Sequence, residues 1–202
     1  MINVKYLVVL LFIHFSLSIS LKATTLDTIP TPFSIKIDLA SEAKKWRDFK
    51  SYDGRFGLLV PGEFVEKVDS IETAIGTLAY HTFFHQTKES NADNVLYMLS
   101  YVDYPDGAIH SDSTELLKDF FAETIDAAVK AVKGELIYSN DWKYKDYPGK
   151  VWRIDYLDGK ALVKTKAFVV RNRYYTMQTI AKKEHSVNFS ADKFLDSFQL
   201  IE

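Results

Sequence analysis

Apolar runs alternate with short polar turns over most of the chain. Three Asp-Gly pairs, at residues 53–54, 106–107 and 158–159, mark turns, because Asp bonds its own backbone and Gly tolerates positive φ. The runs flanking these and other turns have the length and composition of strands. They predict about six to eight strands, drawn from residues 55–60, 64–69, 77–86, 95–103, 135–144, 150–157, 161–170 and 173–180.

Helical periodicity appears in fewer places. Apolar residues recur at a 3.6-residue period from Leu117 to Val132 and predict one long helix. Asp112 is its expected cap, with Glu115 at a capping-box spacing, and Gly134 follows its end. A second helix is expected from Ser190 and a third over residues 41–49. Tightly connected strands with helices between them predict an α+β fold built on a central antiparallel sheet.

The N-terminus has the pattern of a secretory signal peptide. Lys5 precedes an apolar run from Leu7 to Ile13, and small residues follow at Ser18 and Ser20. The rival interpretation, an uncleaved anchor, is disfavoured because a spanning helix needs about 20 apolar residues. We predict a signal peptide over residues 1–20, a leader over 21–40 with a short strand near 33–37, and a single globular domain over 41–202. The mature protein is then secreted or periplasmic.

Composition narrows the class of protein further. Hydrophobic residues make up 47% of the chain and aromatic residues 14%, which argues against disorder. The sequence contains no cysteine, so disulfides, thiolate metal sites and cysteine nucleophiles are excluded. A net charge of −2 argues against nucleic acid as a partner.

Six short segments stand out along the chain, namely Trp46-Arg-Asp-Phe-Lys-Ser-Tyr-Asp-Gly-Arg-Phe-Gly-Leu-Leu-Val-Pro-Gly62, Ile75-Gly76-Thr77, Ser100-Tyr-Val-Asp-Tyr-Pro105, Tyr147-Pro-Gly149, Asn172-Arg-Tyr-Tyr175 and Phe194-Leu-Asp-Ser-Phe198. In this order they resemble PsbP-like domains, and the resemblance covers about residues 46–200.

The resemblance implies a central antiparallel sheet with helices on both faces, an α/β/α sandwich. Its members are mostly non-catalytic binding or assembly proteins, including extrinsic subunits of the photosynthetic oxygen-evolving complex, and a Ran-binding nuclear-import factor shares the fold. We therefore expect no enzyme and no cofactor, but an accessory protein that assists a protein complex in the envelope. The alternative is a periplasmic protein that binds a small ligand or a metal ion.

Catalytic signatures such as G-x-S-x-G, H-E-x-x-H and the P-loop are absent from the sequence. His81 and His85 have a helical metal-ligand spacing, but they fall on a predicted strand, where they would stand about 13 Å apart. Asp103, Asp106 and His110 precede the long helix and are weak candidates for metal ligands, since hard cations prefer oxygen.

Charge is unevenly distributed along the chain. Residues 150–183 have a net charge of +7, whereas residues 24–202 together have −4. A two-residue turn at 158–159 places Arg153 opposite Lys164 and Ile154 opposite Val163. One face of this hairpin is apolar, and the other gathers four cationic side chains, those of Arg153, Lys160, Lys164 and Lys166.

Like charges directly opposite each other on neighbouring strands repel, so we expect something to reduce the repulsion within this basic patch. Solvent or acidic groups of a covering helix, such as Asp119, Glu123 or Asp126, would provide it internally. The alternative is an anionic partner, either an acidic protein surface or weakly contacted membrane headgroups. Five aromatic residues could either line a ligand pocket or fill a core. They are Trp46, Trp142, Trp152, Tyr144 and Tyr147.

Overall fold

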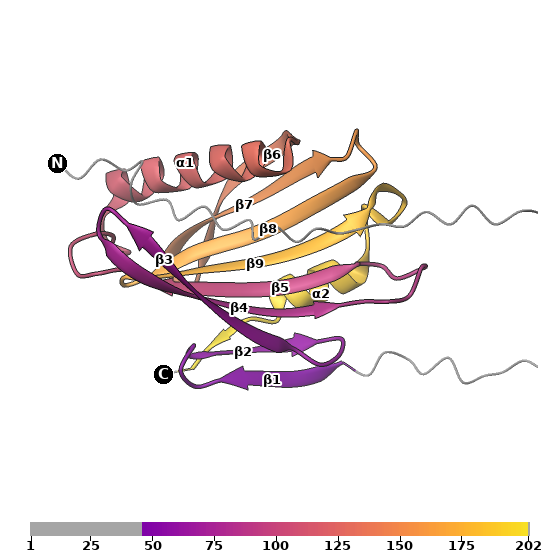
Figure 1. The fold of residues 1–202 in the computed structure, drawn as a ribbon, viewed down its shortest axis with the longest axis horizontal. Helices are drawn as coiled ribbons and strands as arrows, with labels where there is room; N and C mark the ends of the chain where they lie inside the picture. Colours follow the sequence, from indigo (N-terminus) through magenta and orange to yellow (C-terminus); the bar gives the residue numbers. More distant parts are fainter. Residues whose placement is uncertain (1–45, 202) are drawn as a thin grey trace, which may run out of the picture.

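The computed structural model describes residues 46–201. The predicted signal peptide, the leader, the short strand near 33–37 and the first part of the predicted helix over 41–49 lie outside these residues. The elements (Figure 1) are β1 Arg47–Ser51, β2 Phe56–Val60, β3 Val65–Thr73, β4 Gly76–Gln86, β5 Leu96–Asp103, α1 Thr114–Val132, β6 Glu135–Tyr144, β7 Tyr147–Tyr156, β8 Ala161–Val170, β9 Arg173–Lys182, the 3-10 helix η2 Lys183–His185, α2 Phe189–Asp196 and β10 Gln199–Leu200.

Seven strands form the main sheet, in the order β3-β4-β5-β9-β8-β7-β6, and all its neighbours are antiparallel. A second sheet has three strands in the order β1-β2-β10. The fold is thus α+β and dominated by antiparallel sheet, as predicted. The hairpin register is also confirmed, with Arg153 opposite Lys164 and Ile154 opposite Val163.

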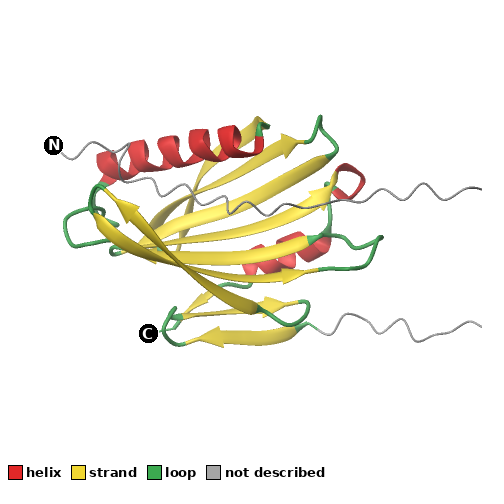
Figure 2. Cartoon of the chain, viewed as in Figure 1, coloured by secondary structure: helices red, strands yellow, loops and turns green. Residues whose placement is uncertain are grey.

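Two core clusters result from the alternation of side chains along the main strands. The first contains the buried stripe of α1 and sheet residues such as Val102, Trp152 and Ile154. The second contains the alternate set, including Leu99 and Phe168, with residues of β2 and α2. The layer that covers the second face of the main sheet therefore combines a small sheet with a two-turn helix. This differs from the predicted sandwich, in which helices alone cover both faces. Figure 2 shows the main sheet separating α1 from the small sheet.

Helix α1 is confirmed, but its predicted cap is wrong. The N-cap position is Ser113, whose side chain makes no capping hydrogen bond. The Asp112 carboxylate lies 3.4 Å from His110 Nδ1 instead. At the other end, Lys133 adopts the left-handed conformation with φ of 49°, and the N–H of Gly134 donates to Val129 O. No helix among residues 46–201 is long and apolar enough to cross a bilayer.

The predicted helix over 41–49 is wrong for its described part, because Arg47–Ser51 is strand β1 paired with β2. Trp46 and Phe49 fit a helical spacing, yet the Phe49 ring packs against Phe56, Phe64 and Phe83. Tertiary contacts with these aromatic residues decide the conformation here, as they commonly override local propensity.

Candidate polar pocket between the sheet and helix α2

A row of polar side chains crosses the second face of the main sheet. Tyr97, Thr179, Lys164, Arg153 and Tyr138 lie directly opposite one another on the adjacent strands β5, β9, β8, β7 and β6. Directly opposite residues share a face, so these five side chains point to the same side of the sheet. This side is the one that contacts α2.

The last four of these residues line a hollow of about 180 Å³ together with residues of the η2–α2 connection and of α2. We call it the Asn188 pocket, and its lining residues are Asn94, Tyr138, Arg153, Leu162, Lys164, Thr179, Ser186, Val187, Asn188, Ala191 and Asp192. Since a water molecule takes about 30 Å³ in the liquid, the hollow has room for one carboxylate-bearing side chain.

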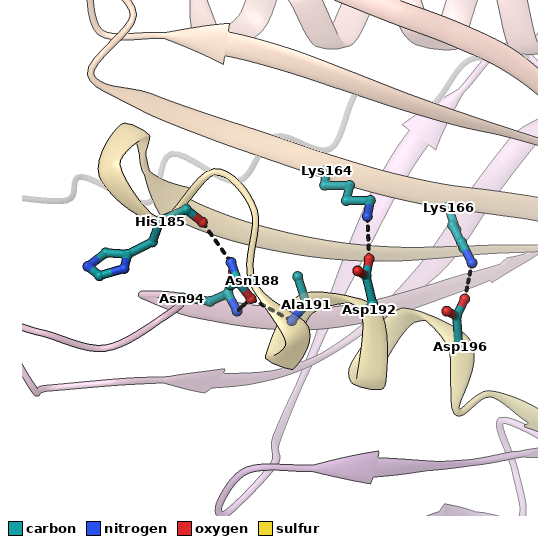
Figure 3. A network of polar contacts seen from close by, with 8 residues as sticks. All are labelled: Asn94, Lys164, Lys166, His185, Asn188, Ala191, Asp192 and Asp196. Carbon is teal, nitrogen blue, oxygen red and sulfur yellow. Dashed lines mark hydrogen bonds and ion pairs between the residues drawn. The ribbon is translucent and has the colours of Figure 1, made fainter.

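Two acidic residues of α2 neutralise part of the predicted basic patch. Lys164 pairs with Asp192, and Lys166 pairs with Asp196 (Figure 3). Four residues along a helix advance about 6 Å, and two residues along a strand advance about 6.6 Å, so both pairs form at once. The counter-charges therefore come from α2 and not from Asp119, Glu123 or Asp126, which lie on α1.

The positive charge of Arg153 is balanced by a carboxylate on its own strand. Its Nε and Nη2 atoms donate to the Asp155 carboxylate at 2.7 and 3.1 Å, and Lys183 bonds the same carboxylate. Burial raises the pKa of the Asp155 carboxyl, but the hydrogen bonds and charges of Arg153 and Lys183 outweigh it and hold this pKa below its ordinary value. Lys160, the fourth residue of the patch, is exposed and forms no ion pair within the described chain.

The pocket retains unused hydrogen-bonding capacity. Thr179 is only 1% exposed, and its Oγ1 atom has no hydrogen-bond partner among the described residues. A buried hydroxyl without a partner is costly. Around it, three cations (Arg153, Lys164 and Lys183) face two carboxylates (Asp155 and Asp192). One positive charge is therefore left over beside an unsatisfied hydroxyl.

Asn188 holds the rim of the pocket in place. Its Oδ1 atom accepts from the N–H of Ala191 at 2.7 Å and from Asn94 Nδ2 at 2.9 Å. Its Nδ2 atom donates to His185 O at 2.8 Å and to Asn94 Oδ1 at 3.2 Å. Asn94 itself is 1% exposed and also donates to Tyr97 OH. One asparagine thus caps α2 and joins it to the β4–β5 connection (Figure 3).

Replacing Asn188 with alanine should therefore lower the free energy of unfolding by about 1 to 2 kcal/mol. The change removes the cap of α2 and one partner of the buried Asn94 amide. Denaturant unfolding measures the loss, and Asn140→Ala, on the exposed part of β6, is the control and should change little. Equal stabilities of the two variants would contradict the anchoring role of Asn188.

The predicted metal ligands Asp103, Asp106 and His110 are not brought together. Both carboxylate oxygens of Asp103 bind Arg173, each at 2.6 Å. Asp106 lies in an exposed turn, and His110 Nδ1 lies 3.4 Å from Asp112. No group of three His, Asp or Glu side chains in residues 46–201 could hold a metal ion.

His81 and His85 lie on strand β4, as predicted, and each forms a polar contact with a different residue. His81 Nδ1 lies 3.0 Å from Glu66 Oε1, and His85 Nδ1 lies 2.9 Å from Glu63 O.

Trp152 is buried in the first core cluster, while Trp46 and Trp142 pack against the second. The tryptophans therefore serve two different cores and do not line one ligand pocket.

Sequence reasoning missed the pocket residues Asn94, Thr179, Asn188 and Asp192. Asn188 carried a usable signal, because asparagine immediately before an apolar helical run is a favoured N-cap. Thr179 carried none, since threonine is ordinary in a strand.

The architecture defines a class of protein: the seven-stranded antiparallel sheet, the long helix between β5 and β6 and the short C-terminal helix form a PsbP-like fold. No family model matches the chain, and no curated protein does. Among solved structures, the chain is similar to the cyanobacterial PsbP (CyanoP) of Synechocystis, with a TM-score of 0.50 and 11% identity, covering 85% of this chain and 98% of that one. The predicted PsbP-like fold is confirmed.

A crystal structure of a protein of unknown function from Pseudomonas aeruginosa also matches, more distantly. Its TM-score is 0.34 and its identity 7%, and the match covers 69% of this chain and 85% of that one.

Proposed function

We propose that this protein is a secreted or periplasmic, non-catalytic accessory protein that holds an acidic group of a protein partner in the Asn188 pocket. One observation carries the proposal: the buried Thr179 hydroxyl, which has no partner, lies in a hollow that also contains Arg153 and Lys164. A carboxylate accepts hydrogen bonds from such donors and balances the remaining positive charge.

The geometry around Arg153 and Lys164 allows an additional acceptor. Arg153 uses Nε and Nη2 on Asp155, and its Nη1 atom makes no further hydrogen bond within residues 46–201. The Lys164 ammonium has three donors, of which Asp192 takes one. Both side chains are partly exposed, at 17% and 27%, so an incoming group can reach them.

The lining residues favour binding over catalysis. They include no histidine. The two carboxylates near the pocket, those of Asp192 and Asp155, are both paired with cations, so the hydroxyl groups have no free general base beside them, which nucleophilic catalysis would need. The signal-peptide pattern of residues 1–20 supports export, and the PsbP-like fold, whose members are mostly non-catalytic, supports an accessory role.

Thr179→Val tests the proposed site, because it removes the hydroxyl and keeps the shape of the side chain. A structural hydroxyl without a partner is unfavourable, so the variant should be as stable as the parent or about 1 kcal/mol more stable. Its affinity for acetate, the carboxylate probe, should nevertheless fall roughly fivefold, which is about 1 kcal/mol. NMR titration at constant ionic strength, following the amides of Thr179 and Ala191, measures both the affinity and the location.

Two further measurements complete this test. Lys164→Gln should weaken acetate binding, whereas Lys118→Gln, on the exposed side of α1, should leave it unchanged. In native envelopes, crosslinking of the tagged parent should yield a partner that the tagged Thr179→Val variant recovers less well. Acetate shifts that do not saturate, or that are equal in parent and variant, would contradict the proposed site.

A further inference from the structure

Two apolar side chains project from the rim of the Asn188 pocket. Val187 is 93% exposed and Phe189 is 80% exposed, and they flank Asn188 on either side. Val187 also lines the pocket. Single exposed apolar residues are ordinary, but these two stand on either side of a pocket-lining residue, and one of them lines the pocket itself.

This rim is rigid. Asn188, between the two apolar residues, makes hydrogen bonds to Ala191, His185 and Asn94 (Figure 3). Ser190 is fixed as well, because its Oγ atom donates to Asp93 Oδ2 at 2.5 Å. The backbone that carries Val187 and Phe189 is thus held before any ligand arrives, so binding there loses little conformational entropy. Aromatic residues, Phe among them, are enriched in the buried core of protein interfaces.

Charges near the rim argue for a protein and against a lipid surface. Binding to anionic lipids relies on clusters of uncompensated basic residues. Outside the pocket, the cations near the rim are Lys160, Lys182 and Lys193 and the carboxylates are Asp93 and Glu184, so one cation is left uncompensated. This falls short of the cluster of about four to eight basic residues that binds a bilayer, while the pocket itself retains a positive charge for a single carboxylate.

We propose that the Asn188 pocket and its rim together recognise a protein segment in which an acidic residue is flanked by apolar residues. The acidic side chain enters the pocket towards Arg153, Lys164 and Thr179, and a neighbouring apolar side chain packs on Val187 and Phe189. This inference rests on the proposed function and adds the kind of sequence that the partner presents.

Probe peptides test the inference. Acetyl-Leu-Glu-Leu-amide should bind at least tenfold more tightly than acetyl-Leu-Gln-Leu-amide and than acetate, as measured by NMR titration of the parent protein. Phe189→Ala should weaken the glutamate peptide about tenfold and leave acetate affinity unchanged. Tyr52→Ala, which removes another exposed aromatic side chain in the turn between β1 and β2, is the matched control and should change neither affinity.

The outcomes separate this inference from the proposed function. If acetate does not bind, the proposed function fails, and the inference falls with it. If acetate binds but the glutamate peptide binds no more tightly, or Phe189→Ala has no effect on it, only the inference is overturned. Co-sedimentation with vesicles of phosphatidylglycerol and phosphatidylcholine, abolished by Phe189→Ala, would also overturn it in favour of a membrane surface.

Discussion

Phe168→Ala is expected to lower the free energy of unfolding by about 4 kcal/mol, the cost of removing a large aromatic side chain from a packed core. Phe168 is completely buried. Its ring centroid lies 4.9 to 5.8 Å from those of four other aromatic residues, which come from β6, β9 and the segment after α2. These are Trp142, Tyr144, Tyr175 and Phe198.

The cavity left by this change should be hard to close. Phe168 lies opposite Gly149, where a Cβ atom would come within 2.3 Å of Ala167 O, so the two strands already approach closely. Equilibrium denaturation measures the loss. Phe189→Ala is the matched control, because the same side chain is lost from an exposed position and stability should change by less than about 0.5 kcal/mol. Similar losses in both variants would refute the packing assigned to Phe168.

Asp155→Asn is expected to lower the free energy of unfolding at pH 7 by about 2 to 3 kcal/mol. Hydrogen bonds to charged groups contribute about 1.5 to 3 kcal/mol each, and Asp155, which is 8% exposed, receives them from both Arg153 and Lys183. The variant leaves Arg153, which is 17% exposed, without its counter-charge.

The same carboxyl makes the stability depend on acid. Its pKa in the folded protein lies below the ordinary value, which is about 3.9 for Asp. The folded state therefore favours the ionised form, and the stabilisation is fully present above about pH 4 and is lost as the pH falls through the lower folded pKa. Unfolding curves between about pH 5 and pH 2 should show a smaller slope for Asp155→Asn than for the parent.

Asp158→Asn provides the control for this second prediction. Asp158 lies three residues further along in the exposed turn between β7 and β8, and it forms no ion pair within the described residues. Its stability and its acid dependence should match those of the parent. An Asp155→Asn variant with the parent's acid dependence would show that other carboxyls govern acid unfolding.

Local patterns predicted most of the sheet. Strands β2 to β9 follow from runs of apolar residues between turns, and the Asp158-Gly159 turn set the β7–β8 register correctly, because a two-residue turn leaves one pairing. Strand β1 was mispredicted as helix because the spacing of Trp46 and Phe49 fits a helical turn. Only the aromatic cluster around Phe49 shows that this segment pairs with β2.

The surroundings of the basic patch do not follow from local patterns. Strand alternation correctly places Arg153, Lys164 and Lys166 on one face, but it cannot say which helix covers that face. Both helices carry acidic residues, and α1 is the longer and better specified of the two. The structure assigns the face to α2, so Asp192 and Asp196 supply the counter-charges.

By itself, the sequence determined the antiparallel α+β class, the order of most elements and the two faces of the basic hairpin, because these depend on turns and on periodicities of two and 3.6 residues. Its PsbP-like character came from the resemblance of short segments and not from these periodicities. Only the tertiary structure decided the Asn188 pocket. Its contacts join residues far apart in the chain, 28 positions between Lys164 and Asp192 and 94 between Asn94 and Asn188. No local pattern encodes such pairs, since they form only when the packing of α2 against the sheet brings these side chains together.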